Sequence, residues 1–267
     1  MLRDITLGQY YPVDSFVHQL DPRTKILLTL GYIIAVFMAS NLLAYVPIVL
    51  FLVLAIRVSR IPAKMMLRSI RPLRVLLIFT FVLNLFFGAG DEVVFRLGFI
   101  VIKYEGLMNA LHFSLRLIFL VMGTSLMTLT TPPVVLTDGL EKLASPLRVI
   151  KFPAHEMAMM MTIALRFIPT LVEEADKIMK AQTARGADFT SGNIKQRTQA
   201  MIPLLVPLFI SAFRRAGDLA MAMEARCYHG GEGRTRLHVL KYGVKDALAA
   251  LVVLGLLAAV FLVGKLL

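Results

Sequence analysis

The sequence has a single cysteine, Cys227, no tryptophan, and few charged residues, which make up 17% of its 267 positions. One cysteine excludes an internal disulfide and any metal cage built from several thiolates. The five histidines, at positions 18, 112, 155, 229 and 238, are scattered, and no two of them form a His-x-x-x-His pair on one helix face. We therefore expect neither a metal site nor a bound cofactor.

Motifs of the common catalytic classes are also missing. The chain has no Gly-x-Ser-x-Gly sequence, no His-Glu-x-x-His sequence and no cluster of carboxylates. It also lacks the Gly-x-x-x-x-Gly-Lys-Ser/Thr loop that holds the phosphates of ATP. We therefore expect no catalytic residues, and ATP that serves this protein would be hydrolysed on a partner.

Apolar residues are abundant, at 58% of the chain. Soluble domains average roughly 45–50% apolar residues, so this excess is too large for one soluble core. The 29 Lys and Arg residues outnumber the 17 Asp and Glu residues, a surplus that membrane proteins place in cytoplasmic loops. Nucleic-acid binding is the other interpretation of a basic chain. We disfavour it because few of the basic residues lie in aromatic-rich or repeated clusters.

Four apolar blocks predict membrane spans. Residues 26–56 carry no charge and are too many for one span of about 20 residues. Because Ser40-Asn41 can form a turn, we expect a helical hairpin with spans near 26–40 and 42–56, and a single tilted helix is the alternative. The remaining blocks are Leu73–Gly90, Gly106–Thr131 and Ala247–Val263. None of the five spans contains Asp or Glu.

The charges between the spans predict their orientation. Six Arg or Lys residues and no acidic residue occur between positions 57 and 74, so we expect this segment in the cytoplasm. Residues 91–105 are then external, and the alternation in Val93–Val101 predicts a small hairpin or amphipathic piece. The N-terminus is expected inside, without a cleavable signal peptide because residues 1–22 have no apolar stretch. Five spans would place Leu267 outside.

These features predict an all-α, multi-pass protein of the cell membrane, with about five transmembrane helices and long amphipathic cytoplasmic helices. We expect a membrane region of about four spans at residues 1–131. Cytoplasmic helices would follow at residues 132–242, and a final transmembrane helix at residues 243–267. An ion-driven secondary carrier would share this layout. Such carriers keep functional carboxylates within the bilayer, and the predicted spans have none.

The cytoplasmic segment predicts one short helical piece, Val134–Leu147, and two long helices at His155–Arg185 and Ile194–Cys227. The second follows an i, i+3, i+4, i+7 apolar pattern, in which a methionine stripe is either ordinary packing or an adaptable binding surface. In the helix predicted at Ile194–Cys227, the run Met201–Phe213 is apolar on every side but too short to span a bilayer. We expect this run at the cytoplasmic membrane face, bent by its prolines and supporting a partner.

Both long helices end in the same short motif. Ala184-Arg185-Gly186 closes one, and Ala225-Arg226-Cys227 closes the other. An arginine at a helix end extends a planar fork of donors that can grip a carboxylate through two hydrogen bonds. The alternative is that each arginine only offsets the negative pole of its helix dipole. The pairing favours a docking role.

These paired motifs resemble those of the T component of energy-coupling factor (ECF) transporters, the EcfT/CbiQ-like family. The stretch from Gly8 through Ser15, followed by His18–Lys25, is similar to the opening of the same family. The resemblance covers essentially the whole chain. The second motif departs from the usual pattern because Cys227 stands where Gly or Ser is common. Since Cys is also small, we expect no loss of docking.

The resemblance implies a transmembrane scaffold that couples ATP-driven motion to uptake of a vitamin or micronutrient. Arg185 and Arg226, with their flanking residues, would dock into grooves on two cytoplasmic ABC ATPase subunits. A small substrate-binding (S) membrane subunit would receive the motion. Arg116, within a predicted span, would contact that subunit or a buried network. The alternative for Arg116 is an internal partner such as Asn84 or a backbone carbonyl.

Overall fold

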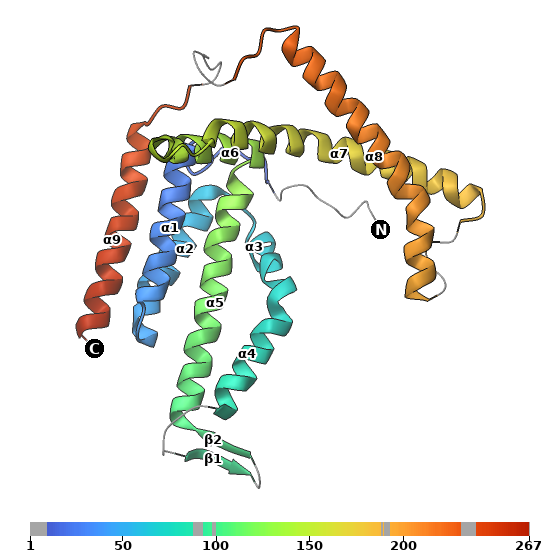
Figure 1. Cartoon of the computed structure of the whole chain (residues 1–267). Coiled ribbons are helices and arrows are strands. Elements are labelled where there is room, and N and C mark those ends of the chain that lie inside the picture. The colour runs from blue at the N-terminus through green and yellow to red at the C-terminus, as the bar shows by residue number, and fades with distance from the viewer. Residues whose placement is uncertain are drawn as a thin grey trace. The chain divides into compact units, whose positions relative to one another are not determined.

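The computed structural model describes residues 10–87, 93–97, 100–187, 189, 193–230 and 239–266. The regular elements of the described part are helices apart from one two-stranded hairpin (Figure 1). The chain divides into two compact units. Of the described residues, those within 10–139 and 240–266 form what we call the bundle unit, and those within 140–230, with residue 239, form the crossed-helix unit.

The bundle unit contains the apolar helices. Its elements are α1 (Pro22–Met38), η2 (Leu42–Ala44), α2 (Tyr45–Ser59), α3 (Ala63–Ile70), η3 (Arg71–Leu73), α4 (Arg74–Phe87), β1 (Val93–Leu97), β2 (Ile100–Lys103), α5 (Tyr104–Thr130) and α9 (Val244–Leu266). The break between α1 and α2 confirms the predicted helical hairpin, so the alternative of one tilted helix is wrong. Most of the basic segment at 57–74, expected only as a loop, is helical in α3 and η3.

Helix α5 lies at the centre of the bundle unit and contacts α1, α2, α3 and α4, while α9 packs against α1 and α2 (Figure 1). Small residues allow close packing where α1 meets its neighbours, because Ala35 and Ala39 are fully buried. The largest buried cluster also holds Tyr32, Val36, Ala44, Tyr45, Ile48, Leu52, Phe119, Leu256 and Val260. A second, smaller cluster joins Met66 of α3 to Leu126 and Leu129 of α5.

Among the residues that the structure describes, four helical segments are long and apolar enough to cross a membrane. They are Leu42–Ser59, Ala63–Phe86, Tyr104–Thr130 and Val244–Lys265. Helix α1 is shorter, at 17 residues, but it packs directly between α5 and α9. Large apolar side chains remain exposed around the bundle, as with Leu50 at 66% and Val75 at 72%. An apolar surface of this kind suits a lipid surrounding.

The strands β1 and β2 pair as an antiparallel hairpin between α4 and α5, with Phe95 opposite Ile102 and Leu97 opposite Ile100. The alternation in Val93–Val101 predicted either a small hairpin or an amphipathic piece. The structure shows that it is the hairpin. The glycine-rich end of the third predicted span, Gly88–Gly90, lies outside the described residues, as does Leu267.

The crossed-helix unit is built mainly from two long helices, α7 (Ala154–Ala184) and α8 (Ile194–Glu224), each of 31 residues. They confirm the two helices predicted at His155–Arg185 and Ile194–Cys227. Helix α6 (Pro133–Ala144) and η4 (Ser145–Ile150) precede them. The boundary between the two units falls within α6, after Gly139.

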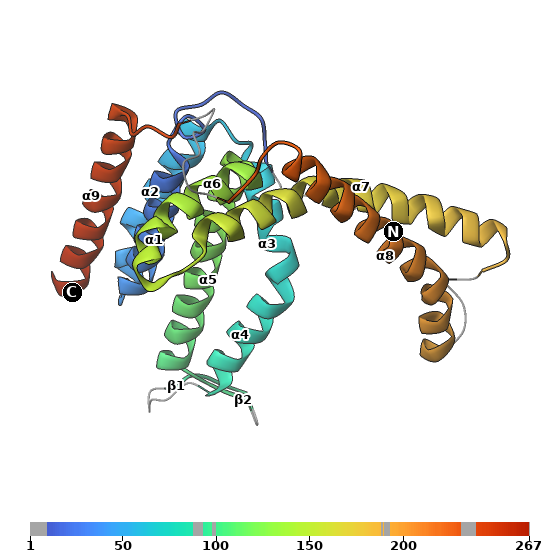
Figure 2. The same cartoon turned by 45° about the horizontal axis from the view of Figure 1, so that its top comes forward.

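Helices α7 and α8 are joined by an ion pair. The Arg215 guanidinium donates to a carboxylate oxygen of Glu174 at 2.7 Å. A hydrogen bond from Ser211 and the positive charge of Arg215 together lower the pKa of Glu174. The two helices cross in both views of the chain (Figure 2). Helix α8 also carries Pro203 and Pro207 in its interior, where each proline removes a backbone hydrogen bond.

Candidate docking site at two helix ends

The C-terminus of α7 is closed by two backbone hydrogen bonds. Gly186 N–H donates to the Thr183 carbonyl at 2.9 Å, and Ala187 N–H donates to the Gln182 carbonyl at 3.0 Å. Gly186 has a φ of 90°, the left-handed conformation that a glycine adopts without strain. This is a Schellman motif, and Arg185 is its C-cap residue.

The C-terminus of α8 is closed in the same way. Cys227 N–H donates to the Glu224 carbonyl at 2.8 Å, and Tyr228 N–H donates to the Met223 carbonyl at 3.0 Å. Cys227 takes the left-handed position with a φ of 55°, so Arg226 is the C-cap residue of a second Schellman motif. The two predicted tripeptides therefore have the same backbone geometry, which their sequences alone did not reveal.

Both motifs lie open to solvent in this chain. All six residues, Ala184, Arg185, Gly186, Ala225, Arg226 and Cys227, are exposed. Within the described part of the chain, neither the Arg185 nor the Arg226 guanidinium has a hydrogen bond or ion pair. Each arginine therefore keeps its full set of donors for a partner.

The two arginines also lie at equal distances from the ion pair that joins their helices. Arg185 follows Glu174, and Arg226 follows Arg215, by the same eleven positions (174 to 185 and 215 to 226). At 1.5 Å of rise per residue, each of these arginines lies about 16 Å along its helix from the ion-paired residue. The unit thus presents two equivalent basic ends, one at the C-terminus of α7 and one at the C-terminus of α8.

The opening motif His18–Lys25 has a structural role within the bundle unit. Asp21 caps α1 by accepting from Arg23 N–H, and the Arg23 guanidinium bonds both Asp21 oxygens, at 3.0 and 2.9 Å. Burial alone would raise the pKa of Asp21, but the hydrogen bonds from Arg23 outweigh it and lower that pKa. Arg23 also lies 3.9 Å above the ring of Tyr242, and Asp246 accepts from Asp21 N–H. These contacts tie α9 to the start of α1.

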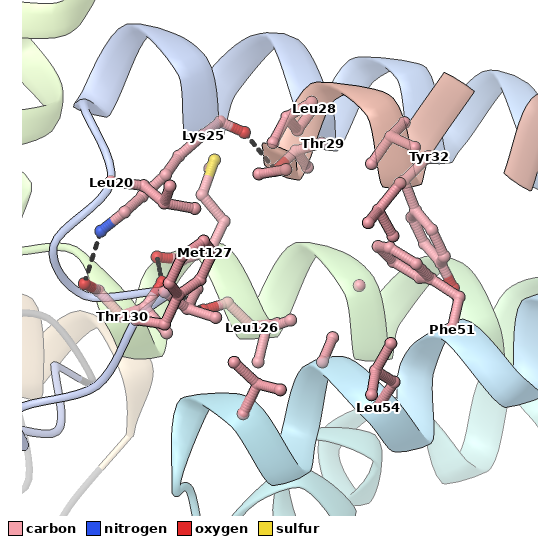
Figure 3. A pocket seen from close by; sticks show the side chains of 18 residues that line it. Leu20, Lys25, Leu28, Thr29, Tyr32, Phe51, Leu54, Leu126, Met127 and Thr130 are labelled. Atoms are coloured by element: carbon pink, nitrogen blue, oxygen red, sulfur yellow. Dashed lines mark hydrogen bonds between the residues drawn. The ribbon is translucent and has the colours of Figure 1, made fainter. Parts of the chain in front are cut away.

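Lys25 completes this structural motif from the first turn of α1. Its ammonium donates to the carbonyls of His18 and Thr130 and to the hydroxyl of Thr131, all at 3.0–3.1 Å. The side chain borders an apolar cavity of about 190 Å³ between α1, α2, α5 and α9, but its nitrogen turns toward Thr130 (Figure 3). We therefore assign Lys25 to the packing of α1 on α5.

Arg116 has an internal backbone partner, as one of the two interpretations of the sequence predicted. Its guanidinium donates to the carbonyl of Ala39 at 3.0 Å and to His112 Nε2 at 2.9 Å. Because a guanidinium can only donate, His112 accepts through Nε2. The suggested partner Asn84 is wrong, since the hydrogen bonds of Arg116 within the described chain go to Ala39 and His112, and the Asn84 amide donates to the carbonyl of Thr80 on its own helix.

Comparisons with known proteins show the family of the chain. A family model described as CbiQ, cobalt transport protein, matches residues 14–237. The energy-coupling factor transporter transmembrane protein EcfT of Acidaminococcus fermentans is 56% identical over 256 residues, which are 96% of this chain and 95% of that protein.

Two further relatives carry the same name. EcfT of Thermosediminibacter oceani is 55% identical over 257 residues, which are 96% of each chain. EcfT of Bacillus subtilis is 46% identical over 259 residues, which are 96% of this chain and 98% of that protein. With its apolar spanning helices, this chain therefore belongs to the EcfT/CbiQ family of multi-pass membrane transport proteins.

Proposed function

We propose that this chain is the transmembrane scaffold of an ECF-type ABC importer and that it transmits the motion of two ATPases to a substrate-binding membrane subunit. The observation that carries the proposal is the pair of matching Schellman ends, each presenting an exposed arginine without a partner in the described chain. Two equivalent ends suit two copies, or two homologues, of one partner. The chain itself has no ATP-binding loop, so hydrolysis belongs to those partners.

The docking contact that we propose is a charge pair. Each guanidinium would meet a carboxylate in a groove on one ATPase subunit, through two parallel hydrogen bonds. The rigid Schellman turn supports this role because it stops the helix directly after the arginine and leaves its side chain at the tip. The flanking Ala and Gly or Cys residues are small, so a groove can close around the helix end.

The apolar surface of α8 supports a second docking role. Seven large side chains of Met201–Phe213 are more than 40% exposed, and Phe213 reaches 74%. They are Met201, Ile202, Leu205, Val206, Phe209, Ile210 and Phe213. Such a surface on one helix requires a partner or a membrane face. We assign it to the S subunit, which would bring the vitamin or micronutrient.

We further propose the division and orientation of the chain. Residues 1–131 and 243–267 would form the membrane region, and residues 132–242 would lie in the cytoplasm with the N-terminus. The basic segment 57–74 would face the same side, because Arg and Lys residues flank spans on the cytoplasmic side. The C-terminus would then be external.

Substitution of the two arginines tests the docking role. Arg185→Ala or Arg226→Ala should weaken pull-down of the ATPases and reduce ATP-dependent uptake in proteoliposomes. Removing one partner of a buried charge pair costs roughly 2–5 kcal/mol. Arg→Lys should rescue only partly because Lys lacks the planar fork. The double variant should be weaker than either single one, since each arginine would grip a different subunit.

The matched control for this experiment is Arg166→Ala, which removes an exposed α7 arginine from the same helix but not from its end. It should leave uptake and pull-down unchanged. Full uptake and normal pull-down in the Arg185→Ala, Arg226→Ala double variant would refute the docking role.

A further inference from the structure

A groove of about 720 Å³ opens at the end of the bundle unit that carries the turn between α1 and α2. One wall is this turn, with Ser40 and Asn41. The other is a single face of α5, where Asn109, His112 and Arg116 follow one another at nearly one-turn spacing. None of the residues that line the groove is acidic. The groove therefore offers hydroxyl, amide and guanidinium donors to an anionic ligand.

Arg116 is the one positive charge among the residues lining this groove, and its hydrogen bonding is incomplete. The guanidinium has partners in Ala39 and His112, but its Nε is buried without a hydrogen-bond acceptor in the described chain. A buried guanidinium N–H without an acceptor is unfavourable, because charged donors lose more than neutral ones when they are desolvated. An oxygen-rich anion in the groove would supply a counter-charge to this guanidinium.

The position of the groove follows from a difference in helix length. Lys25 of α1 bonds the carbonyl of Thr130, and Ala39 just after α1 bonds Arg116, so α1 runs beside the 116–130 half of α5. Helix α5 begins twelve positions earlier, at Tyr104, and so extends about 18 Å past the turn. Figure 1 shows α5 reaching beyond the turn between α1 and α2. The groove lies where the short α1–α2 hairpin ends and the longer helix α5 continues.

The short hairpin also affects the bilayer around it. With 17 and 15 residues, α1 and α2 are about 25 and 22 Å long, less than the roughly 30 Å of a hydrocarbon core. A bilayer adapts to a short apolar segment by thinning, which draws headgroups toward the end of that segment. Exposed Phe37, Leu43 and Phe113 lie beside the groove and suit acyl chains.

From these observations we propose that the groove binds one membrane phospholipid, whose phosphodiester meets the Arg116 guanidinium and whose chains lie along the apolar rim. Where the bilayer is thinned, the headgroup phosphate is the anion that comes close to this groove. The donors of Ser40, Asn41 and Asn109 would then surround the phosphate oxygens. The site is independent of the ATPase docking proposed above, since it lies wholly within the bundle unit.

The test is a titration of the full-length chain in mild detergent with dioleoyl phosphatidylglycerol, followed by native mass spectrometry. Wild type should retain one lipid, and Arg116→Gln should bind it roughly ten- to a hundredfold more weakly, the range expected for a lost hydrogen bond to a charged group. Arg57→Gln removes an exposed arginine from the last turn of α2 and should bind like wild type. Equal binding by wild type and Arg116→Gln would overturn the proposal.

A second variant separates lipid binding from folding. Asn109→Trp fills the groove but leaves the bonds of Arg116 to Ala39 and His112 in place, so it should weaken lipid binding without lowering the unfolding temperature. Dioleoylglycerol, which lacks the phosphate, should bind neither protein, and soluble glycerol phosphate should not compete. Binding of dioleoylglycerol, or competition by glycerol phosphate, would contradict a phospholipid site. A photo-crosslinker at position 109 that captures a membrane protein in cells in place of lipid would also contradict it.

Discussion

At the scale of single residues, the two proposed docking ends differ in one backbone requirement. Gly186 and Cys227 occupy the same left-handed position, with φ values of 90° and 55°. Glycine populates this region freely, whereas the Cβ of other residues is crowded there by a carbonyl oxygen. The end of α8 therefore carries strain that the end of α7 does not, although both make the same pair of hydrogen bonds.

Replacing Cys227 by glycine should relieve that strain. We expect Cys227→Gly to strengthen the α8 terminus by about 1 kcal/mol, partly offset by the greater freedom of glycine in the unfolded chain. Amide hydrogen exchange of Tyr228, whose N–H closes the motif, should slow several-fold. The matched variant Cys227→Val should speed it, since a branched side chain fits this conformation poorly. Faster exchange in Cys227→Gly would contradict the strain.

At the scale of elements, α1 and α5 pack at a position where no side chain fits. A Cβ added to Gly123 of α5 would lie 2.0 Å from a ring carbon of Tyr32 in α1. The ring cannot swing away easily, because it stacks on Phe51 at 5.6 Å and its hydroxyl donates to the carbonyl of Phe119 at 2.8 Å. The glycine thus sets how closely the two helices approach.

Gly123→Ala should therefore destabilise the bundle by overpacking, typically by about 1–3 kcal/mol. The expected result is a lower thermal unfolding temperature of the purified chain in detergent. Gly255→Ala is the matched control: it lies on α9, where an added Cβ meets nothing within 4 Å, so it should be neutral or stabilising through helix propensity. Equal unfolding temperatures for the two variants would refute the packing argument.

Helix positions were predictable from hydropathy, and finer features were not. The charge-free stretch at 26–56 and the polar pair Ser40-Asn41 together predicted the α1–α2 hairpin. In the basic segment, however, the charges of Lys64 and Arg68 concealed a helix whose apolar side places Met66 in the core. Charge sets the side of the membrane on which such a segment lies, but periodicity sets its conformation.

The residues of the proposed docking site were predictable, but their backbone geometry was not. The repeated Ala-Arg-small endings identified Arg185 and Arg226, and both are exposed C-cap residues. The left-handed conformation at Cys227 had no signal in the residue type, because Schellman turns usually place glycine there. The opening motif was recognised only as a family resemblance. Its contacts, from Asp21 to Asp246 of α9 and from Arg23 to Tyr242 just before α9, depend on residues more than 200 positions away.

At the scale of the whole molecule, the charges divide between two sides of the proposed membrane. The chain carries a net charge of +12, and the segment around α3 alone contributes six basic residues between positions 57 and 74. The opposite end of the bundle unit bears the β1–β2 hairpin and the start of α5, with the acidic Glu105 in its first turn. An excess of positive charge on one side is the pattern by which membrane proteins are oriented.

Cysteine labelling of intact cells should reveal this orientation. The native Cys227 is exposed and would itself react, so the experiment starts from a Cys227→Ser background. In that background, Tyr104→Cys at the start of α5 should react with a membrane-impermeant maleimide added outside. Lys64→Cys in α3 is also exposed and should react only after the cells are permeabilised, because the basic segment remains inside. The reverse pattern, with Lys64→Cys labelled in intact cells and Tyr104→Cys protected, would invert the topology and place both arginine ends on the side without ATP.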